Sequence, residues 1–138
     1  MISAFVLLGC LGVTLIAAKA TRLSLQSDER LHLAISTGNM LEAFIRSTDP
    51  PRWPDSWEEL LESPSSSEFL EHSPERYSTE LILDFDATLE SIAAQERTEL
   101  DAIEVNGYPW VEGWRDYLPD VPAAAREMLA GNANKSDP

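Results

Sequence analysis

The strongest pattern in the chain is an apolar run at its amino terminus. Ile2 to Ala18 contain no charged side chain, and the run approaches the length that crosses the hydrocarbon core of a bilayer. Inside a soluble domain of a 138-residue chain, such a run would have to be buried on every side. The pattern therefore predicts a membrane or export segment over residues 1–20, an acidic helical domain over residues 21–131 and a disordered tail over residues 132–138.

Three fates fit this apolar segment. Lys19 and Arg22 follow it, and the positive-inside rule would then keep an uncleaved anchor with the domain in the cytoplasm. Residues 18–20, Ala-Lys-Ala, match the small-x-small pattern that precedes a signal-peptide cleavage site. Residues 7–10, Leu-Leu-Gly-Cys, resemble a bacterial lipobox, which implies a lipidated Cys10 at the start of an exported lipoprotein. We favour the single-pass membrane anchor, and the side of the membrane that holds the domain stays open.

Beyond the apolar segment, hydrophobic positions recur at helical spacing from Ser27 to about Ser47. Ser27 can cap this helix, and the acids that follow it suit the positive end of the helix dipole. Residues 49–51, Asp-Pro-Pro, end the helix because proline disfavours helical backbone in the residue before it. One face of this helix is apolar and is a candidate contact surface; its residues are Leu31, Ile35, Leu41, Phe44 and Ile45.

The rest of the chain predicts three more helices. Residues 54–56, Pro-Asp-Ser, open a short one, with Glu58 three residues after Asp55 as in a capping box. Residues 63–67 then read as a loop. A last helix is expected from Asp120 to Ala130, because a glycine follows it.

The stretch from Tyr77 to Phe85 is the one candidate strand. Its centre is apolar, but one isolated strand cannot form a sheet. We therefore expect this stretch to join a helix that runs from about Asp86 to Val105. The predicted fold class is mainly α, with about four helices behind the membrane or signal helix.

The amino-acid composition limits the classes of partner that we expect this protein to bind. The net charge is -14, from 24 acidic against 10 basic side chains, so a nucleic acid is not expected, because phosphate backbones are bound by basic patches. A basic protein partner, divalent cations or a salty exterior suit the charge better, and the acidity also fits a role that only keeps the domain soluble. The single Cys10 excludes an internal disulfide, and His32 and His72 have no partner at metal-binding spacing. We expect no metal site and no cofactor, and a small-molecule ligand stays open.

One short motif suggests chemistry. Residues 81–89, Leu-Ile-Leu-Asp-Phe-Asp-Ala-Thr-Leu, resemble the first motif of the haloacid-dehalogenase phosphatases. The resemblance implies a nucleophile at Asp84, an acid/base at Asp86 and a phosphate-binding Thr88, with a magnesium ion and a lysine beside them. It also implies a doubly wound sheet, whereas the only lysine after the motif is Lys135 in the expected tail. We favour a capped helix start at this point.

The layout of the first third of the chain carries a second resemblance. An apolar segment that runs into an amphipathic helix and then a Pro/Trp-rich turn is similar to the minor pilins and pseudopilins. That family implies a subunit of a secretion or pilus assembly with a processed amino terminus. The chain departs from the family pattern, since its leader has no basic residue and no acid precedes Asp28.

Three aromatic residues gather late in the chain around Gly113. They are either a contact surface or part of a helical core; they are Trp110, Trp114 and Tyr117. With no catalytic motif in its structural context, the sequence favours a single-pass, membrane-associated accessory or scaffold protein that presents an acidic helical interaction domain. The alternatives are a pseudopilin-like subunit and a phosphatase that uses Asp84 and Asp86.

Overall fold

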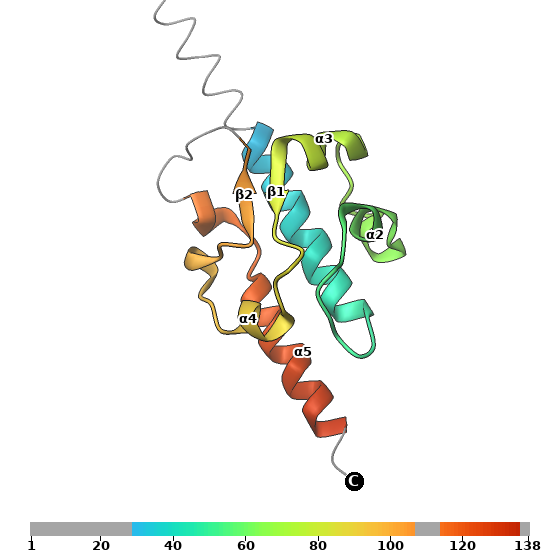
Figure 1. Cartoon of the computed structure of the whole chain (residues 1–138), viewed down its shortest axis with the longest axis vertical. Coiled ribbons are helices and arrows are strands. Elements are labelled where there is room, and N and C mark those ends of the chain that lie inside the picture. The colour runs from blue at the N-terminus through green and yellow to red at the C-terminus, as the bar shows by residue number, and fades with distance from the viewer. Residues whose placement is uncertain (1–28, 107–113, 136–138) are drawn as a thin grey trace, which may run out of the picture. The chain divides into compact units, whose positions relative to one another are not determined.

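The computed structural model describes residues 29–106 and 114–135. The chain divides into two compact units, Met1–Arg30 and Leu31–Pro138, and the second carries the described core. This part is mainly helical, as the hydrophobic pattern predicts, and it also contains one small sheet that the pattern did not predict (Figure 1). After a helix at residues 29–47, the elements are α2 (Trp57–Glu62), α3 (Pro74–Glu80), β1 (Leu81–Leu83), α4 (Leu89–Ala93), β2 (Ile103–Val105) and α5 (Val121–Lys135), with short 3-10 turns at Pro64–Ser66, Arg97–Glu99 and Trp114–Tyr117.

The helix at residues 29–47 confirms the prediction of a helix from Ser27 to about Ser47. Leu33, Thr37 and Leu41 repeat every four residues, and all three are fully buried. The helix ends as expected before the Asp49-Pro50 bond, which is cis. Thr48 closes the last turn, because its backbone N–H and its hydroxyl both donate to the carbonyl of Phe44, each at 3.1 Å. The predicted cap at Ser27 lies outside the described residues.

The short helix α2 begins one residue later than its predicted capping box. Ser56 is the N-cap, and its hydroxyl accepts a hydrogen bond from the backbone N–H of Glu59 at 3.1 Å. The Glu59 carboxylate reaches back to the N–H of Asp55 at 3.2 Å. Glu59 is therefore bonded to both Ser56 and Asp55, and the predicted pairing of Asp55 with Glu58 was wrong by one position.

The two-stranded sheet corrects the expectation of one helix from Asp86 to Val105. Strand β1 pairs antiparallel with β2, with Ile82 opposite Glu104. Between them, α4 covers only Leu89–Ala93, capped by Thr88 and Ser91 in a reciprocal capping box. The apolar residues from 89 to 103 keep helical spacing, but they are inward positions of three short elements. The strand at residues 81–83 finds its partner about twenty residues further along, so it does not join a helix.

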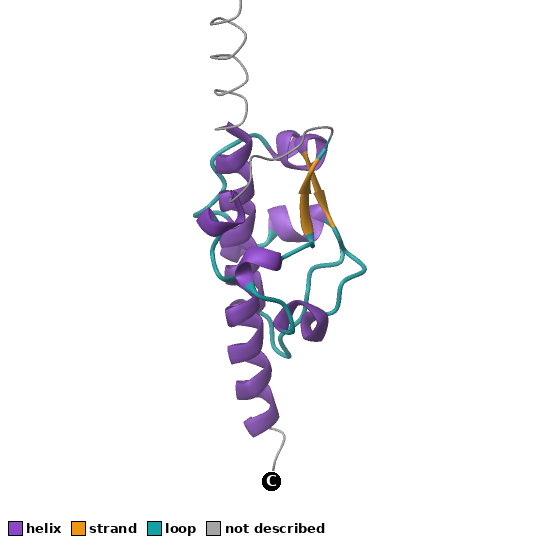
Figure 2. Cartoon of the chain, turned by 90° about the vertical axis from the view of Figure 1, so that its left-hand side faces the viewer, coloured by secondary structure: helices purple, strands orange, loops and turns teal. Residues whose placement is uncertain are grey.

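The core lies between the helix at 29–47 and the elements that follow it. Figure 2 shows the two strands standing on one side of the long helices. A buried polar chain ties the first helix to α3: Tyr77 donates its hydroxyl to Ser36 at 2.7 Å, and Ser36 donates to the Phe69 carbonyl at 2.5 Å. The largest fully buried side chains include Tyr77, Leu33, Met40, Leu41, Ile45, Leu60, Leu81, Ile92, Leu100, Ile103 and Val121.

The last helix, α5, is longer than predicted. Asp120 caps it, accepting from the N–H of Ala123 at 3.0 Å. The helix then continues through Gly131 to Lys135, so the expected stop at Ala130 and the disordered tail from residue 132 were wrong for residues 132–135. Over residues 29–106 and 114–135, every helix is too short or too polar to cross a membrane. The predicted membrane segment, Ile2 to Ala18, lies outside the described residues.

Candidate functional site

The candidate contact face on the first helix packs inside its own domain. Leu41, Phe44 and Ile45 are all buried, and Leu31 and Ile35 are partly buried against the same core. A side chain that already fills the core cannot meet a partner without opening the domain. The helical spacing of these five residues is therefore accounted for by folding, and a contact surface has to be sought among exposed side chains.

The two late aromatic residues that the structure describes, Trp114 and Tyr117, differ in burial. Trp114 is buried, and the Arg115 guanidinium lies over its ring at 4.8 Å. Tyr117 is 69% exposed, three residues away on the same 3-10 turn. Trp110 lies outside the described residues. The structure thus places Trp114 in the core and leaves Tyr117 at the surface.

The residues of the phosphatase-like motif form the turn between β1 and α4. Asp84 and Asp86 are exposed, and the Asp84 carboxylate accepts a hydrogen bond from the N–H of Asp86 at 3.0 Å. Thr88 caps α4. The motif begins on β1, which belongs to a sheet of two antiparallel strands in the described residues. The phosphatase fold requires a sheet of several parallel strands. These side chains shape a turn and a helix start, although the cap is Thr88 and neither of the two acids.

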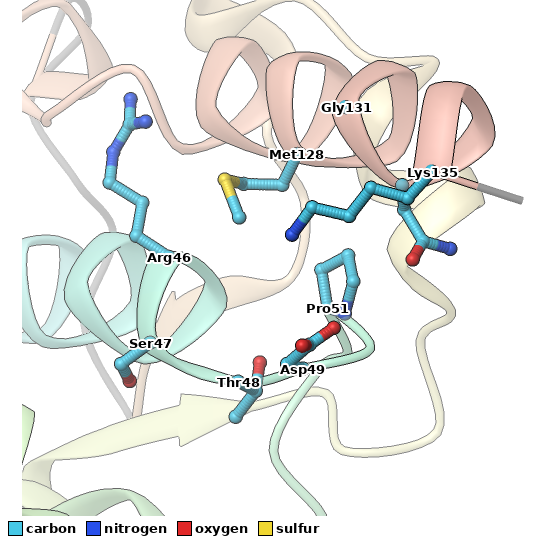
Figure 3. A pocket seen from close by; sticks show the side chains of 9 residues that line it. Arg46, Ser47, Thr48, Asp49, Pro51, Met128, Gly131 and Lys135 are labelled. Carbon is cyan, nitrogen blue, oxygen red and sulfur yellow. The ribbon is translucent and has the colours of Figure 1, made fainter.

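A shallow hollow lies where the end of the first helix meets α5. Its volume is about 160 Å³, and Figure 3 shows Lys135 reaching over it toward Asp49 and Pro51. Arg46, on the rim, donates a hydrogen bond to Glu127 at 3.0 Å, and this bond raises the pKa of the guanidinium above its ordinary value. The lining of this hollow combines the opposite charges of Asp49 and Lys135 with the apolar Pro51 and Met128. No group of acids, histidines and cysteines in the described residues could hold a metal ion.

Two arginines of this acidic domain, Arg115 and Arg126, bind backbone carbonyls. Arg126 donates to the carbonyls of Ala93 and Gln95, both at 2.9 Å, and so completes the carboxyl end of α4. Arg115 donates to the Leu100 carbonyl at 2.9 Å. A guanidinium bound to backbone oxygens neutralises no carboxylate, in contrast to Arg46, Arg52 and Arg76, which pair with glutamates. Arg115 and Arg126 therefore act in folding without neutralising the acids around them.

Arg52 and Glu59 form a close ion pair, with 2.6 Å between the guanidinium and the carboxylate. The hydrogen bond from Arg52 lowers the pKa of the Glu59 carboxyl below its ordinary value. Arg52 also lies over the ring of Phe44 at 5.1 Å. The pair is partly exposed and fixes the turn between the first helix and α2, so it belongs to the fold.

The exposed residue that the sequence pattern missed is Ile82. Side chains alternate along both strands, so Leu81 and Leu83 point inward and Ile82 points outward. Ile82 is 48% exposed, and the exposed Glu104 stands directly opposite it on β2. Ile82 and Tyr117 are the exposed large hydrophobic residues of the described domain. Residues 81–83, Leu-Ile-Leu, are apolar throughout, so the outward position of Ile82 follows only from the strand pairing.

Comparison with protein-family models found no match, and comparisons with curated proteins and with solved structures found none either.

Proposed function

We propose that this protein is a membrane-tethered, non-catalytic accessory protein whose acidic domain binds a basic partner protein. The observation that carries the proposal is how the domain uses its charges. Arg115 and Arg126 donate to backbone carbonyls and neutralise no acid among the described residues, while most acids are exposed on a chain with a net charge of -14. Such a surface attracts cationic partners from a distance and repels acidic ones.

The membrane segment supports this function by position. An apolar run of the length of Ile2 to Ala18 would hold the domain at the bilayer as a transmembrane or signal helix. Restriction to a membrane raises the effective concentration of two proteins that share it. A weak, charge-driven contact then becomes sufficient for assembly.

The tether is tested by fractionation. The full chain and a variant that lacks residues 1–20 are expressed, and membranes are washed at alkaline pH. We expect the full chain in the pellet and the shortened chain in the supernatant. A full chain that leaves the membrane as readily as the shortened one contradicts the tether. The intact mass of the purified full chain, against 15.3 kDa, reports whether the segment is retained.

Charge-driven binding is tested on the full chain in lipid nanodiscs. A fluorescent Lys-rich peptide is titrated at rising salt, with a Glu-rich peptide of equal length as the control. The attraction between exposed charges is screened with a Debye length of about 10 Å at 0.1 M salt, so affinity for the Lys-rich peptide falls steeply as salt rises. Equal binding of both peptides, or none of either, contradicts the proposed function.

A second candidate is a pseudopilin-like subunit. The observation that favours it is the packing of the helix at 29–47 in one domain with an antiparallel strand pair, since the family combines a long first helix with strands. This function requires a processed amino terminus and assembly with other subunits. Loss of an amino-terminal leader, seen by mass, together with co-purification in a filament fraction would favour it over the accessory protein.

A further inference from the structure

We infer that the outward face of the β1–β2 pair is the docking surface for the basic partner. In this complex, an apolar side chain of the partner packs on Ile82. This inference rests on the proposed function and names the surface that performs it. The surface, called here the sheet face, consists of Ile82, Glu104 and Asp84.

The sheet face is unpartnered within the described domain. The inward residues of both strands are buried, whereas Ile82 and Glu104 are exposed. Figure 2 shows the strands at the margin of the described domain, with the long helices on their other side. Because strand positions alternate between the two faces, this face carries the side chains that the core does not use.

The chemistry of the sheet face combines one apolar centre with negative charge. Ile82 is directly opposite Glu104 across the ladder, a pairing that brings the two β-carbons to roughly 5 Å. Asp84 is two residues along β1 from Ile82, beyond the end of the strand, and it is exposed. A desolvated apolar contact within a rim of charge is the usual arrangement of an interface centre.

The negative charge of the sheet face indicates which kind of segment binds there. Glu104 has no ion pair in the described structure, so its charge is available to a cationic side chain. The matching ligand is a segment with Lys or Arg beside an apolar residue. An acidic or purely apolar segment would leave these carboxylates facing like charge or buried without a partner.

Tyr117 is a weaker centre for such a surface. It is more exposed than Ile82, but it sits on a 3-10 turn. Ile82 lies on a strand that is paired with β2. A rigid element holds a contact residue more accurately than a turn does.

The test uses the full chain in nanodiscs and two fluorescent Lys-rich peptides that differ in one central residue, Leu or Gly. Wild type should bind the Leu peptide about three- to tenfold tighter, since the leucine side chain removes apolar area from water. Ile82→Ser should abolish this preference. Glu104→Lys should weaken both peptides by about three- to tenfold.

Glu90→Lys is the matched control, because it makes the same charge change at an exposed site on α4. It should alter binding by less than about twofold if the sheet face is the site. Equal losses for Glu90→Lys and Glu104→Lys, or a Leu preference that survives Ile82→Ser, overturn the docking surface and leave the proposed function standing. Failure of wild type to bind either peptide overturns both. Thermal unfolding checks each variant, and Ile82→Thr replaces Ile82→Ser if the latter is unfolded.

Discussion

The two long helices of the domain are stabilised in different ways. The helix at 29–47 is packed along most of its length, and its polar Ser36 and Thr37 are buried with their hydroxyls bonded. Helix α5 buries its first residues, from Val121 to Ala125, and leaves its last two turns largely at the surface. The first helix is therefore a core element, whereas α5 is partly exposed to solvent. Substitutions at comparable positions in the two helices test this difference in stability.

The largest difference is expected for leucine truncation. Leu41→Ala, on the first helix, removes a fully buried side chain and should lower the free energy of unfolding by about 2–5 kcal/mol. Leu129→Ala, on α5, removes a partly buried side chain and should cost less than about 1.5 kcal/mol. Urea unfolding of the full chain in mild detergent, followed by tryptophan fluorescence, measures both. Equal losses would show that the last turns of α5 are as tightly packed as the first helix.

The glycines of the two helices should respond with opposite sign. At Gly38, an added β-carbon would come to 2.8 Å from Cδ of Pro119, closer than van der Waals contact permits. Alanine is a better helix former than glycine by about 1 kcal/mol, but overpacking against a rigid ring costs about 1–3 kcal/mol. Gly38→Ala should therefore lower the free energy of unfolding by about 1 kcal/mol. A rise would show that the chain around Pro119 yields.

Gly131→Ala is the counterpart in α5. A β-carbon added there meets no atom within 4 Å, and the residue is helical. The substitution should raise the free energy of unfolding by about 0.5–1 kcal/mol, through helix propensity and a less flexible unfolded chain. The same urea titration measures it. No gain would indicate that the last turn of α5 is frayed in solution.

The smallest effect concerns the ion pair between the two helices. Arg46 bonds Glu127 at 3.0 Å, and the Glu127 side chain is 68% exposed. A double-mutant cycle with Arg46→Gln and Glu127→Gln should give a coupling of about 0.5 kcal/mol, which high salt reduces further. The cycle is measured at low and at high salt. A coupling above about 1.5 kcal/mol would mean that charge contributes to joining the helices as much as packing does.

Long, strongly amphipathic elements were predictable from the sequence, and short paired ones were not. The first helix shows its apolar face over five turns, and a proline pair marks its end. Strands β1 and β2 have three residues each, and their pairing spans about twenty residues. Nothing local in Ile103–Val105 distinguishes a strand from the end of a helix. The end of α5 was missed because Gly131 resembles a helix stop, although its backbone stays helical.

The same limit applies to the candidate site. Exposure of Ile82 depends on the register that sets it opposite Glu104, so it follows from a pairing that no local pattern contains. Burial of Leu41, Phe44 and Ile45 explains why an apolar helix face alone could not identify a contact surface. A hydrophobic stripe shows that a face is covered. It does not show whether the cover comes from the same chain or from another.

The close approach of Gly38 to Pro119 also has a consequence for synthesis. The first helix leaves the ribosome early, but the ring that covers Gly38 and the arginine that completes α4, Arg126, belong to the last part of the chain. The domain therefore cannot close until the segment that holds Pro119 and Arg126 has been made. Until then part of the surface that the first helix buries in the folded domain lacks its cover, and such transiently exposed apolar surface is prone to aggregation.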